Sequence, residues 1–233
     1  MLLPRLGIDR THGLVKICGL REPDHARAAV AAGADLLGFV FAPARRQVTA
    51  EQARACVDAA REAAGEQHIL AVGVFVDASA EDMNAAAETA DLDLLQLHGE
   101  EAPTLRSRLD RPVVKALRPP PGASLSDVLA LVVRYQGDAD EPLAYLLDGH
   151  DPNTAGGTGV RANWTLAADL ARRVPLVLAG GLDPSNVGEA IATAEPLAVD
   201  VSSGVETDGV KDPHKIAAFV DAARRAFTAS ATV

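Results

Sequence analysis

The chain has 233 residues, of which 48% are hydrophobic, and its 22 Lys+Arg against 32 Asp+Glu give a formal net charge of −10. This length and hydrophobic content suit one large domain or two small ones with a sizeable core, and they argue against global disorder. The acidic balance argues against a nucleic-acid partner, because phosphate backbones require a cationic surface.

Cysteine usage and the N-terminus exclude further classes of protein. Cys18 and Cys56 are too few for a disulfide framework, and no Cys/His spacing resembles a zinc site, so we expect no metal. No apolar run reaches about 18 residues, and Arg5, Asp9 and Arg10 interrupt the N-terminus. We therefore expect a cytoplasmic protein with no membrane span and no signal peptide.

Short apolar runs alternate with helical patterns along the whole chain. Pro23 suits the first turn of a helix, Thr49 and Gln52 form a capping box, and Ser79 is a typical N-cap. The apolar runs predict strands at residues 14–18, 35–41, 69–76, 92–97, 112–117, 144–147, 174–178 and 197–201. The intervening patterns predict helices at residues 22–32, 51–61, 79–90, 100–109, 162–172, 184–192 and 212–225, and one that begins near 125.

Eight strand-then-helix units in about 220 residues predict the fold class. Strands that are apolar on both faces and alternate with helices are typical of a parallel sheet, and eight such units predict a closed (β/α)₈ TIM barrel. An open doubly wound sheet is the alternative, although no GxGxxG follows the first strand. No composition break marks a linker, so we expect one domain over residues 1–233, with 1–12 as an N-terminal extension and 228–233 as a loose tail.

The first predicted strand ends in a thiol. Side chains alternate along a strand, so Val15 and Ile17 share one face while Lys16 and Cys18 share the other. A lone buried cysteine is more often a small hydrophobe than a reactive group. The neighbouring lysine and the glycine that follows make a functional site equally plausible.

In a (β/α)₈ barrel the active site lies at the carboxyl ends of the strands. By alternation Gln96 and His98 face the barrel, and Lys115 is a buried lysine that needs a partner or a function. Asp148 directly follows the sixth strand, and it is either a functional acid or an aspartate that only starts a turn. The loop after the second strand carries Arg45 and Arg46.

Glycine-rich loops follow the last three strands. They are Gly156-Gly157-Thr158-Gly159, Ala179-Gly180-Gly181 and Ser202-Ser203-Gly204. Glycines let a backbone approach an anion closely, and the loops after strands 7 and 8 are the usual phosphate cradle of this architecture. We therefore predict a phosphorylated small-molecule substrate.

A thiol and a carboxylate on opposite walls of a barrel suit an isomerisation that needs no cofactor. One group can take a proton while the other gives one. The ammonium of Lys16 would stabilise the thiolate of Cys18, and partial burial would favour the protonated form of Asp148.

Seven segments together resemble the phosphoribosylanthranilate isomerase family of tryptophan biosynthesis. They are VKICGLREPDHA, GADLLGFVFAPARRQV, LLQLHGEE, LLDGH, GGTG, LAGGLDPSNV and AVDVSSGVE, in order from about Val15 to Phe219. The resemblance implies a (β/α)₈ barrel that converts N-(5′-phosphoribosyl)anthranilate to 1-(2-carboxyphenylamino)-1-deoxyribulose 5-phosphate by an Amadori rearrangement.

The resemblance also implies residue roles. Cys18 would be the general base that removes the proton from C2′, Asp148 the general acid that protonates the furanose ring oxygen, and Arg46 the partner of the anthranilate carboxylate. The other expected substrate-binding residues are Gln96, His98, Gly157, Thr158, Gly159, Gly180, Gly181, Asp200, Ser202, Ser203 and Gly204. Cys56 lies in a helical pattern and is expected to be structural.

The chain departs from the family pattern in the loop after Phe41, which is one residue shorter and has Ala44 where serine is common, so Arg45 is an alternative to Arg46. Two other functions stay open at this point. A related isomerase of histidine biosynthesis would carry an aspartate where Cys18 stands, and a non-catalytic phosphate binder would need only the glycine loops. We expect a monomer or a homodimer.

Overall fold

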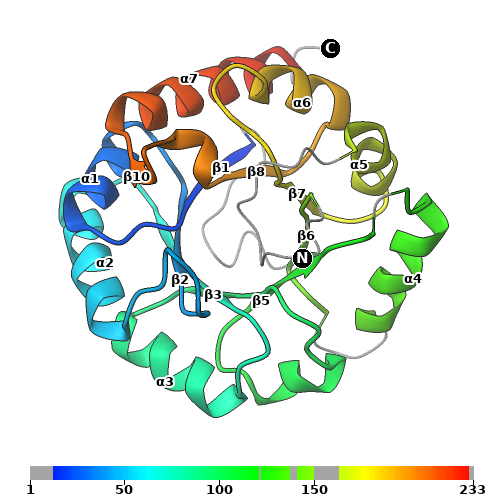
Figure 1. Ribbon diagram of the computed structural model, residues 1–233, viewed down its shortest axis with the longest axis horizontal. Coiled ribbons are helices and arrows are strands. Elements are labelled where there is room, and N and C mark those ends of the chain that lie inside the picture. Colours follow the sequence, from blue (N-terminus) through cyan, green and yellow to red (C-terminus); the bar gives the residue numbers. More distant parts are fainter. Residues whose placement is uncertain (1–12, 121, 137–140, 150–162, 231–233) are drawn as a thin grey trace.

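The computed structural model describes residues 13–120, 122–136, 141–149 and 163–230, and its eight parallel strands close into a barrel (Figure 1). Each strand pairs with the next along the chain, and the last pairs with the first. The strands are β1 (Leu14–Cys18), β2 (Leu36–Val40), β3 (Leu70–Phe75), β4 (Leu94–Leu97), β5 (Val113–Leu117), β6 (Ala144–Leu147), β7 (Leu176–Leu178) and β8 (Ala198–Val201). The closure confirms the predicted (β/α)₈ barrel and excludes an open sheet.

Helices form a ring outside the barrel and cover the outer face of the sheet (Figure 1). They are α1 (Pro23–Ala31), α2 (Ala50–Ala64), α3 (Ala80–Ala90), α4 (Leu125–Tyr135), α5 (Trp164–Ala171), α6 (Val187–Ala194) and α7 (Pro213–Ser230). The predicted start signals are confirmed: Thr49 and Gln52 form a capping box, and the Ser79 side chain accepts a hydrogen bond from the Asp82 backbone. In the described ranges, no helix is long and apolar enough to cross a membrane.

Alternation along the strands separates two apolar layers. Val15 and Ile17 of β1 belong to the layer between strands and helices, whereas Leu14 belongs to the apolar cluster inside the barrel. Lys16 and Cys18 therefore point inward, as the period of two predicted. Burying the apolar side chains of these two layers stabilises the barrel and the helices that surround it.

The predicted helix at residues 100–109 is wrong in extent and type. The structure has a short 3₁₀ helix, η3 (Pro103–Arg108), and residues 99–102 form a loop. The Glu101 carboxylate explains the difference, because it turns inward and accepts hydrogen bonds from the backbone of Asp77 (3.1 Å) and Gly99 (2.9 Å). It also pairs with Lys115, so it cannot head a helix at this position.

Two other boundaries differ from the prediction. The helix expected from residue 184 begins at Val187, because the Asn186 side chain accepts a hydrogen bond from the backbone of Asp183 and donates one to the carbonyl of Gly181. The expected loose tail is partly helical, since α7 continues to Ser230 with Phe227 packed in the core. Residues 1–12 and 231–233 lie outside the described ranges.

A small hairpin after β8 was missed. The one-turn 3₁₀ helix η4 (Ser203–Val205) leads into β9 (Glu206–Thr207), which pairs with β10 (Val210–Lys211). Asp208 and Gly209 connect the two strands with φ values of 51° and 79°. Strands of two residues are too short to show alternation, but the Asp-Gly pair is a recognised hairpin signal.

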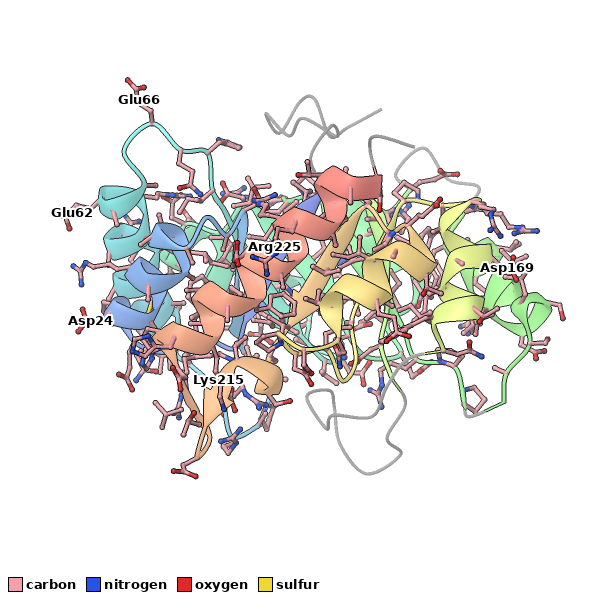
Figure 2. The ribbon with its side chains drawn as sticks, turned by 90° about the horizontal axis from the view of Figure 1, so that it is seen from above. Asp24, Glu62, Glu66, Asp169, Lys215 and Arg225 are labelled. Carbon is pink, nitrogen blue, oxygen red and sulfur yellow. The ribbon has the colours of Figure 1, made fainter. Side chains whose placement is uncertain are left out.

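The two edges of the barrel carry different connections. Figure 2 shows Glu66, in the loop before β3, at one edge, and Lys215, in the first turn of α7 after the hairpin, at the opposite edge. The connections that follow the strands therefore gather at the edge marked by Lys215. This is the edge where an active site is expected.

A buried ion pair stabilises the loop after β4. The Lys115 Nζ donates to the carbonyls of Leu97 (3.2 Å) and Gly99 (2.6 Å) and to Glu101 Oε2 (2.9 Å). The side chains of Lys115 and Glu101 are 4% and 1% exposed. The pair satisfies the predicted need of Lys115 for a partner and holds the loop that follows His98.

Replacing Lys115 tests this account. Lys115→Met leaves the Glu101 carboxylate buried without its cation, so we expect the free energy of unfolding to fall by about 3–5 kcal/mol. Urea unfolding followed by circular dichroism measures the change. The exposed Arg54–Asp58 pair gives the control, since Arg54→Met should cost no more than about 1 kcal/mol. Equal losses in the two variants would contradict the structural role of Lys115.

Candidate active site

Polar side chains gather inside the barrel near the carboxyl ends of four strands. Cys18 ends β1, His98 follows β4, Asp148 follows β6, and Asp200 lies on β8. All four are buried, with exposures of 6–8%. The structure thus brings together predicted site residues that are far apart in the sequence.

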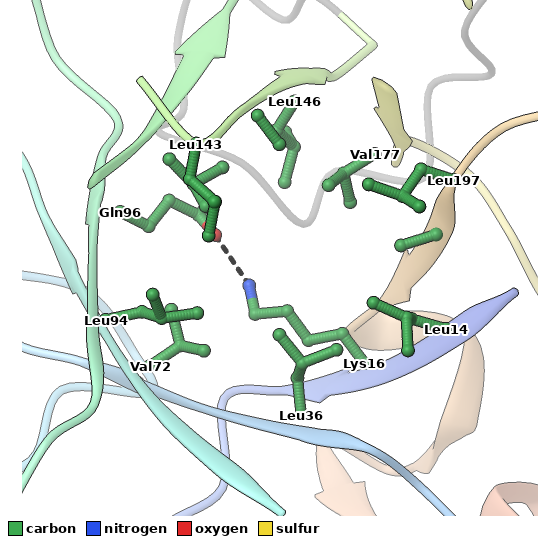
Figure 3. Close-up of a pocket in the computed structure, with 13 residues that line it drawn as sticks. Leu14, Lys16, Leu36, Val72, Leu94, Gln96, Leu143, Leu146, Val177 and Leu197 are labelled. Atoms are coloured by element: carbon green, nitrogen blue, oxygen red, sulfur yellow. Dashed lines mark hydrogen bonds between the residues drawn. The ribbon is translucent and has the colours of Figure 1, made fainter. Parts of the chain in front are cut away.

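Lys16 lies at the centre of this group. It stands opposite Asp200 in the β1–β8 register, and its Nζ donates to Asp200 Oδ2 (3.0 Å) and to Gln96 Oε1 (2.6 Å) across the barrel. Figure 3 shows the Lys16–Gln96 bond in a pocket lined mostly by aliphatic side chains. Burial disfavours the ammonium, but Asp200 and Cys18 outweigh burial and raise the pKa of Lys16. These partners favour the ammonium form of Lys16.

The ammonium of Lys16 fixes the hydrogen-bond directions along a chain of side chains. An ammonium only donates, so the Gln96 oxygen faces it and the Gln96 amide nitrogen donates to His98 Nδ1 (2.9 Å). His98 Nδ1 then carries no proton, and in the neutral ring the proton lies on Nε2. His98 Nε2 lies 3.3 Å from Asp148 Oδ2, in a contact whose angles are not those of a hydrogen bond.

The chain Lys16–Gln96–His98 therefore connects β1 to Asp148 on β6. Each member sets the orientation of the next, and the imidazole of His98 lies against the Asp148 carboxyl group. This orders the acid that the sequence analysis selected. Asp200 Oδ1 is a buried oxygen with no hydrogen-bond partner among the described residues.

The Cys18 thiol lies in a narrow space beside β2. A Cβ placed on Gly38 would come within 2.7 Å of Cys18 Sγ, so a side chain there would collide with the thiol. Burial raises the pKa of Cys18, Lys16 lowers it, Asp200 raises it, and Lys211 and Arg46 lower it. The predicted stabilisation of the thiolate by Lys16 is present, but burial is the larger effect and the net pKa is raised.

Arg46 reaches across the end of β1. A Cβ on Gly19, whose φ is +76°, would lie 2.4 Å from the Cδ of Arg46, so the arginine side chain passes over this glycine beside Cys18. The guanidinium of Arg46 donates to Glu206 through Nε (2.6 Å) and Nη2 (2.9 Å). The Arg46 side chain is 13% exposed, whereas that of Arg45 is 54% exposed.

Glu206 and Lys211 are site residues that the sequence analysis missed. Lys211 is buried and donates to the carbonyl of Ser202 (2.8 Å) and to Glu206 Oε1 (2.9 Å). Burial alone would raise the pKa of Glu206, but its bonds to Arg46 and Lys211 outweigh burial and lower the pKa to about 2. A buried carboxylate thus remains charged among cations. The segment DVSSGVE, part of the resemblance, ends in Glu206 and was the available signal.

The loops after β7 and β8 touch at the same edge. Gly180 and Gly181 have φ values of +84° and +63°, and neither of their backbone N–H groups donates to the backbone of another described residue. A Cβ on Gly204 would lie 1.9 Å from the carbonyl oxygen of Leu182. These glycines permit the close approach of backbone that an anion site requires.

The other predicted phosphate residues divide into two groups. The Ser202 side chain donates to the carbonyl of Cys18 (3.2 Å), and Ser203 begins η4. Gly157, Thr158 and Gly159 lie outside the described ranges. The site therefore offers a thiol and a carboxyl group for proton transfer, an arginine beside the thiol, and glycine loops beside the carboxyl group.

Comparison with known proteins agrees with this geometry. The family model "N-(5'phosphoribosyl)anthranilate (PRA) isomerase" matches residues 15–222. The chain is 46% identical to the N-(5'-phosphoribosyl)anthranilate isomerase of Roseiflexus sp. (strain RS-1), over 91% of this chain and 98% of the relative. It is 44% identical to that of Desulforudis audaxviator, over 91% and 98% of the two chains.

Solved structures give the same result. The phosphoribosyl anthranilate isomerase of Thermotoga maritima has a TM-score of 0.77 and 35% identity, over 91% of this chain and 99% of that one. Another structure of such an isomerase holds reduced 1-(o-carboxyphenylamino)-1-deoxyribulose 5-phosphate. It has a TM-score of 0.74 and 34% identity, over 91% of this chain and 99% of that one.

The raised pKa of Cys18 is testable by titrating the thiol. Burial disfavours the thiolate, so the ultraviolet absorbance of the Cys18 thiolate should appear with a midpoint above about pH 8.5, the ordinary value for a free thiol. The Cys56→Ala variant isolates this signal, since burial raises the pKa of Cys56 to about 11. A midpoint near pH 7 would contradict the dominance of burial.

Proposed function

The chain belongs to the N-(5′-phosphoribosyl)anthranilate isomerase family, and on this premise we propose which of its residues carry out the reaction. The protein is an isomerase of tryptophan biosynthesis. It converts N-(5′-phosphoribosyl)anthranilate to 1-(2-carboxyphenylamino)-1-deoxyribulose 5-phosphate. The rearrangement needs one proton delivered to the furanose ring oxygen and one removed from C2′.

We assign the proton delivery to Asp148 and the proton removal to Cys18. Asp148, in its acid form, protonates the ring oxygen as the ring opens and leaves an iminium at C1′. The Cys18 thiolate then removes the proton from C2′. The resulting enolamine becomes the ketone when its C2′ hydroxyl loses a proton and C1′ gains one. The observation that carries this assignment is the pair of buried groups at the ends of β1 and β6, joined through Lys16, Gln96 and His98.

Lys16 and His98 support the two proton transfers in this proposal. The Lys16 ammonium lowers the pKa of Cys18 against the effect of burial, and so increases the fraction of thiolate that can act as a base. His98 Nε2 lies 3.3 Å from Asp148 Oδ2, near enough to stabilise the carboxylate that forms when the acid has given up its proton. Both are positioning residues.

We assign the anthranilate carboxylate to Arg46. The side chain of Arg46 passes over Gly19 beside Cys18, whereas Arg45 is half-exposed and donates to the carbonyl of Gly209 (2.8 Å). An arginine can bind a carboxylate with two parallel hydrogen bonds, which gives direction as well as charge. These contacts favour Arg46 over Arg45.

We assign the substrate phosphate to the loops after β7 and β8. Their backbone at Gly180, Gly181, Ser203 and Gly204 supplies N–H donors at the edge where barrels of this class hold phosphates. The family member solved with a phosphorylated product analogue supports this class of ligand. A monomeric or homodimeric state stays a prediction, and so does the cytoplasmic location.

Two substitutions test the catalytic assignment. Cys18→Ala and Asp148→Ala each remove one proton-transfer group, so each should lower kcat at least about 10²-fold. The affinity for the reduced product analogue should stay within about tenfold, because these groups act on the transition state. The loss of fluorescence of freshly made phosphoribosylanthranilate measures turnover.

The second cysteine gives the matched control. Cys56 is a buried residue of α2, packed in the layer between strands and helices, so Cys56→Ala should turn over near the wild-type rate. Wild-type turnover in Cys18→Ala or in Asp148→Ala would contradict the role given to that residue. A wild-type protein that binds the analogue without turnover would favour a non-catalytic binder.

A further inference from the structure

One carboxylate at the active-site edge holds three cations. Glu206 Oε2 accepts from Arg45 Nη2 (2.6 Å) and Arg46 Nη2 (2.9 Å), and Glu206 Oε1 accepts from Arg46 Nε (2.6 Å) and Lys211 Nζ (2.9 Å). We call these four residues the Glu206 cluster. Only 6% of the Glu206 side chain is exposed. The mechanism described above uses Arg46 but gives Glu206 no part.

The Glu206 cluster has an unbalanced charge. Three cations and one carboxylate give the cluster a net charge of about +2. Arg46, Lys211 and Glu206 are shielded from water, where electrostatic interactions are stronger than at the surface, whereas Arg45 is half-exposed. A second carboxylate entering the cluster would reduce this excess. The cluster is therefore suited to hold one carboxylate permanently and to bind another.

The way Glu206 binds Arg46 leaves part of the guanidinium available. Glu206 uses Nε and Nη2, along one edge of the group. Nη1 of Arg46 makes no hydrogen bond to any residue in the described part of the chain. A guanidinium has five N–H donors in a planar fork, so a second carboxylate can bind on the Nη1 side while Glu206 stays in place.

The hairpin after β8 keeps Glu206 itself in position. Lys215 Nζ donates to the backbone carbonyl of Glu206 (2.7 Å), and the Thr207 hydroxyl donates to Asp212 Oδ2 (2.8 Å). The Asp212 backbone donates in turn to the carbonyl of Val205 (2.9 Å). Lys215 marks this edge of the barrel in Figure 2. These hydrogen bonds fix the backbone of the hairpin at Glu206. The Glu206 carboxylate can therefore orient the side chain of Arg46.

We propose that Glu206 is the positioning residue for substrate recognition: it holds Arg46 side-on beside Cys18, so that the Nη1 side of the guanidinium receives the aromatic carboxylate of the substrate. This rests on the role given to Arg46 above and adds the residue that sets its direction. Without the negative charge, Arg45, Arg46 and Lys211 repel one another and Arg46 leaves its place over Gly19.

A pair of product analogues tests the proposal. One is the reduced product analogue, and the other has the same sugar phosphate with an unsubstituted phenyl ring in place of the carboxyphenyl ring. The ratio of their inhibition constants measures recognition of the carboxylate alone. We expect Glu206→Gln to lower the wild-type preference for the carboxylate about tenfold or more, and Arg46→Met to lower it by a similar factor.

Further variants separate positioning from folding and from charge. Glu206→Asp keeps the charge and should retain more of the preference than Glu206→Gln. The double variant Glu206→Gln/Arg46→Met should lose no more preference than Arg46→Met alone, because both changes act through one guanidinium. For Glu206→Gln we expect KM to rise while kcat stays within about tenfold of wild type, with an unchanged circular dichroism spectrum.

A matched control removes the same charge elsewhere. Glu62 lies on α2, where its side chain is 80% exposed, and Glu62→Gln should leave the preference as in wild type. Figure 2 shows Glu62 on the outer surface.

Two results would overturn the proposal. Wild-type preference in Glu206→Gln would show that Arg46 needs no positioning by Glu206. A tighter-binding carboxylate analogue in Glu206→Gln would show that Glu206 competes with the substrate for Arg46. An unchanged preference in Arg46→Met would instead contradict the role of Arg46 under the proposed function, whatever Glu206→Gln does.

Discussion

The buried ammonium of Lys16 is the constraint on which the active-site arrangement depends. A lysine that is 3% exposed must find partners, and it finds Asp200 on the adjacent strand and Gln96 across the barrel. These bonds orient the Gln96 amide, which fixes the tautomer of His98, whose Nε2 lies 3.3 Å from Asp148 Oδ2. The same ammonium lowers the pKa of the Cys18 thiol against the effect of burial. One charge thus orders both ends of the proposed proton-transfer pair.

The distribution of charge explains how an acidic chain takes an anionic ligand. The whole sequence has a formal net charge of −10, yet three cations meet at Glu206 beside the end of β1. The loops after β7 and β8 supply backbone donors for the phosphate in our proposal. The substrate carries negative charge at two ends, and in our proposal cationic side chains bind one end and backbone donors bind the other.

Much of this arrangement follows from local sequence patterns, and the rest depends on contacts between distant segments. The period of two in β1 placed Lys16 and Cys18 on the inner face, and repetition of strand and helix predicted the barrel. Glu206 escaped prediction because its partner Arg46 lies 160 residues away and its strand has only two residues. The prediction of a helix at 100–109 was wrong for the same kind of reason, because the ion pair between Lys115 and Glu101 is a tertiary contact.

A crystal structure of the protein with the reduced product analogue tests the central claim most directly. Our account predicts that Cys18 Sγ lies within about 3.5 Å of C2′ and that the Asp148 carboxyl group lies on the opposite side of the sugar chain. It also predicts the phosphate at Gly180, Gly181, Ser203 and Gly204, with the carboxylate at Arg46. A bound analogue whose C2′ lies far from Cys18, or whose carboxylate does not reach Arg46, would contradict the assignment of these residues.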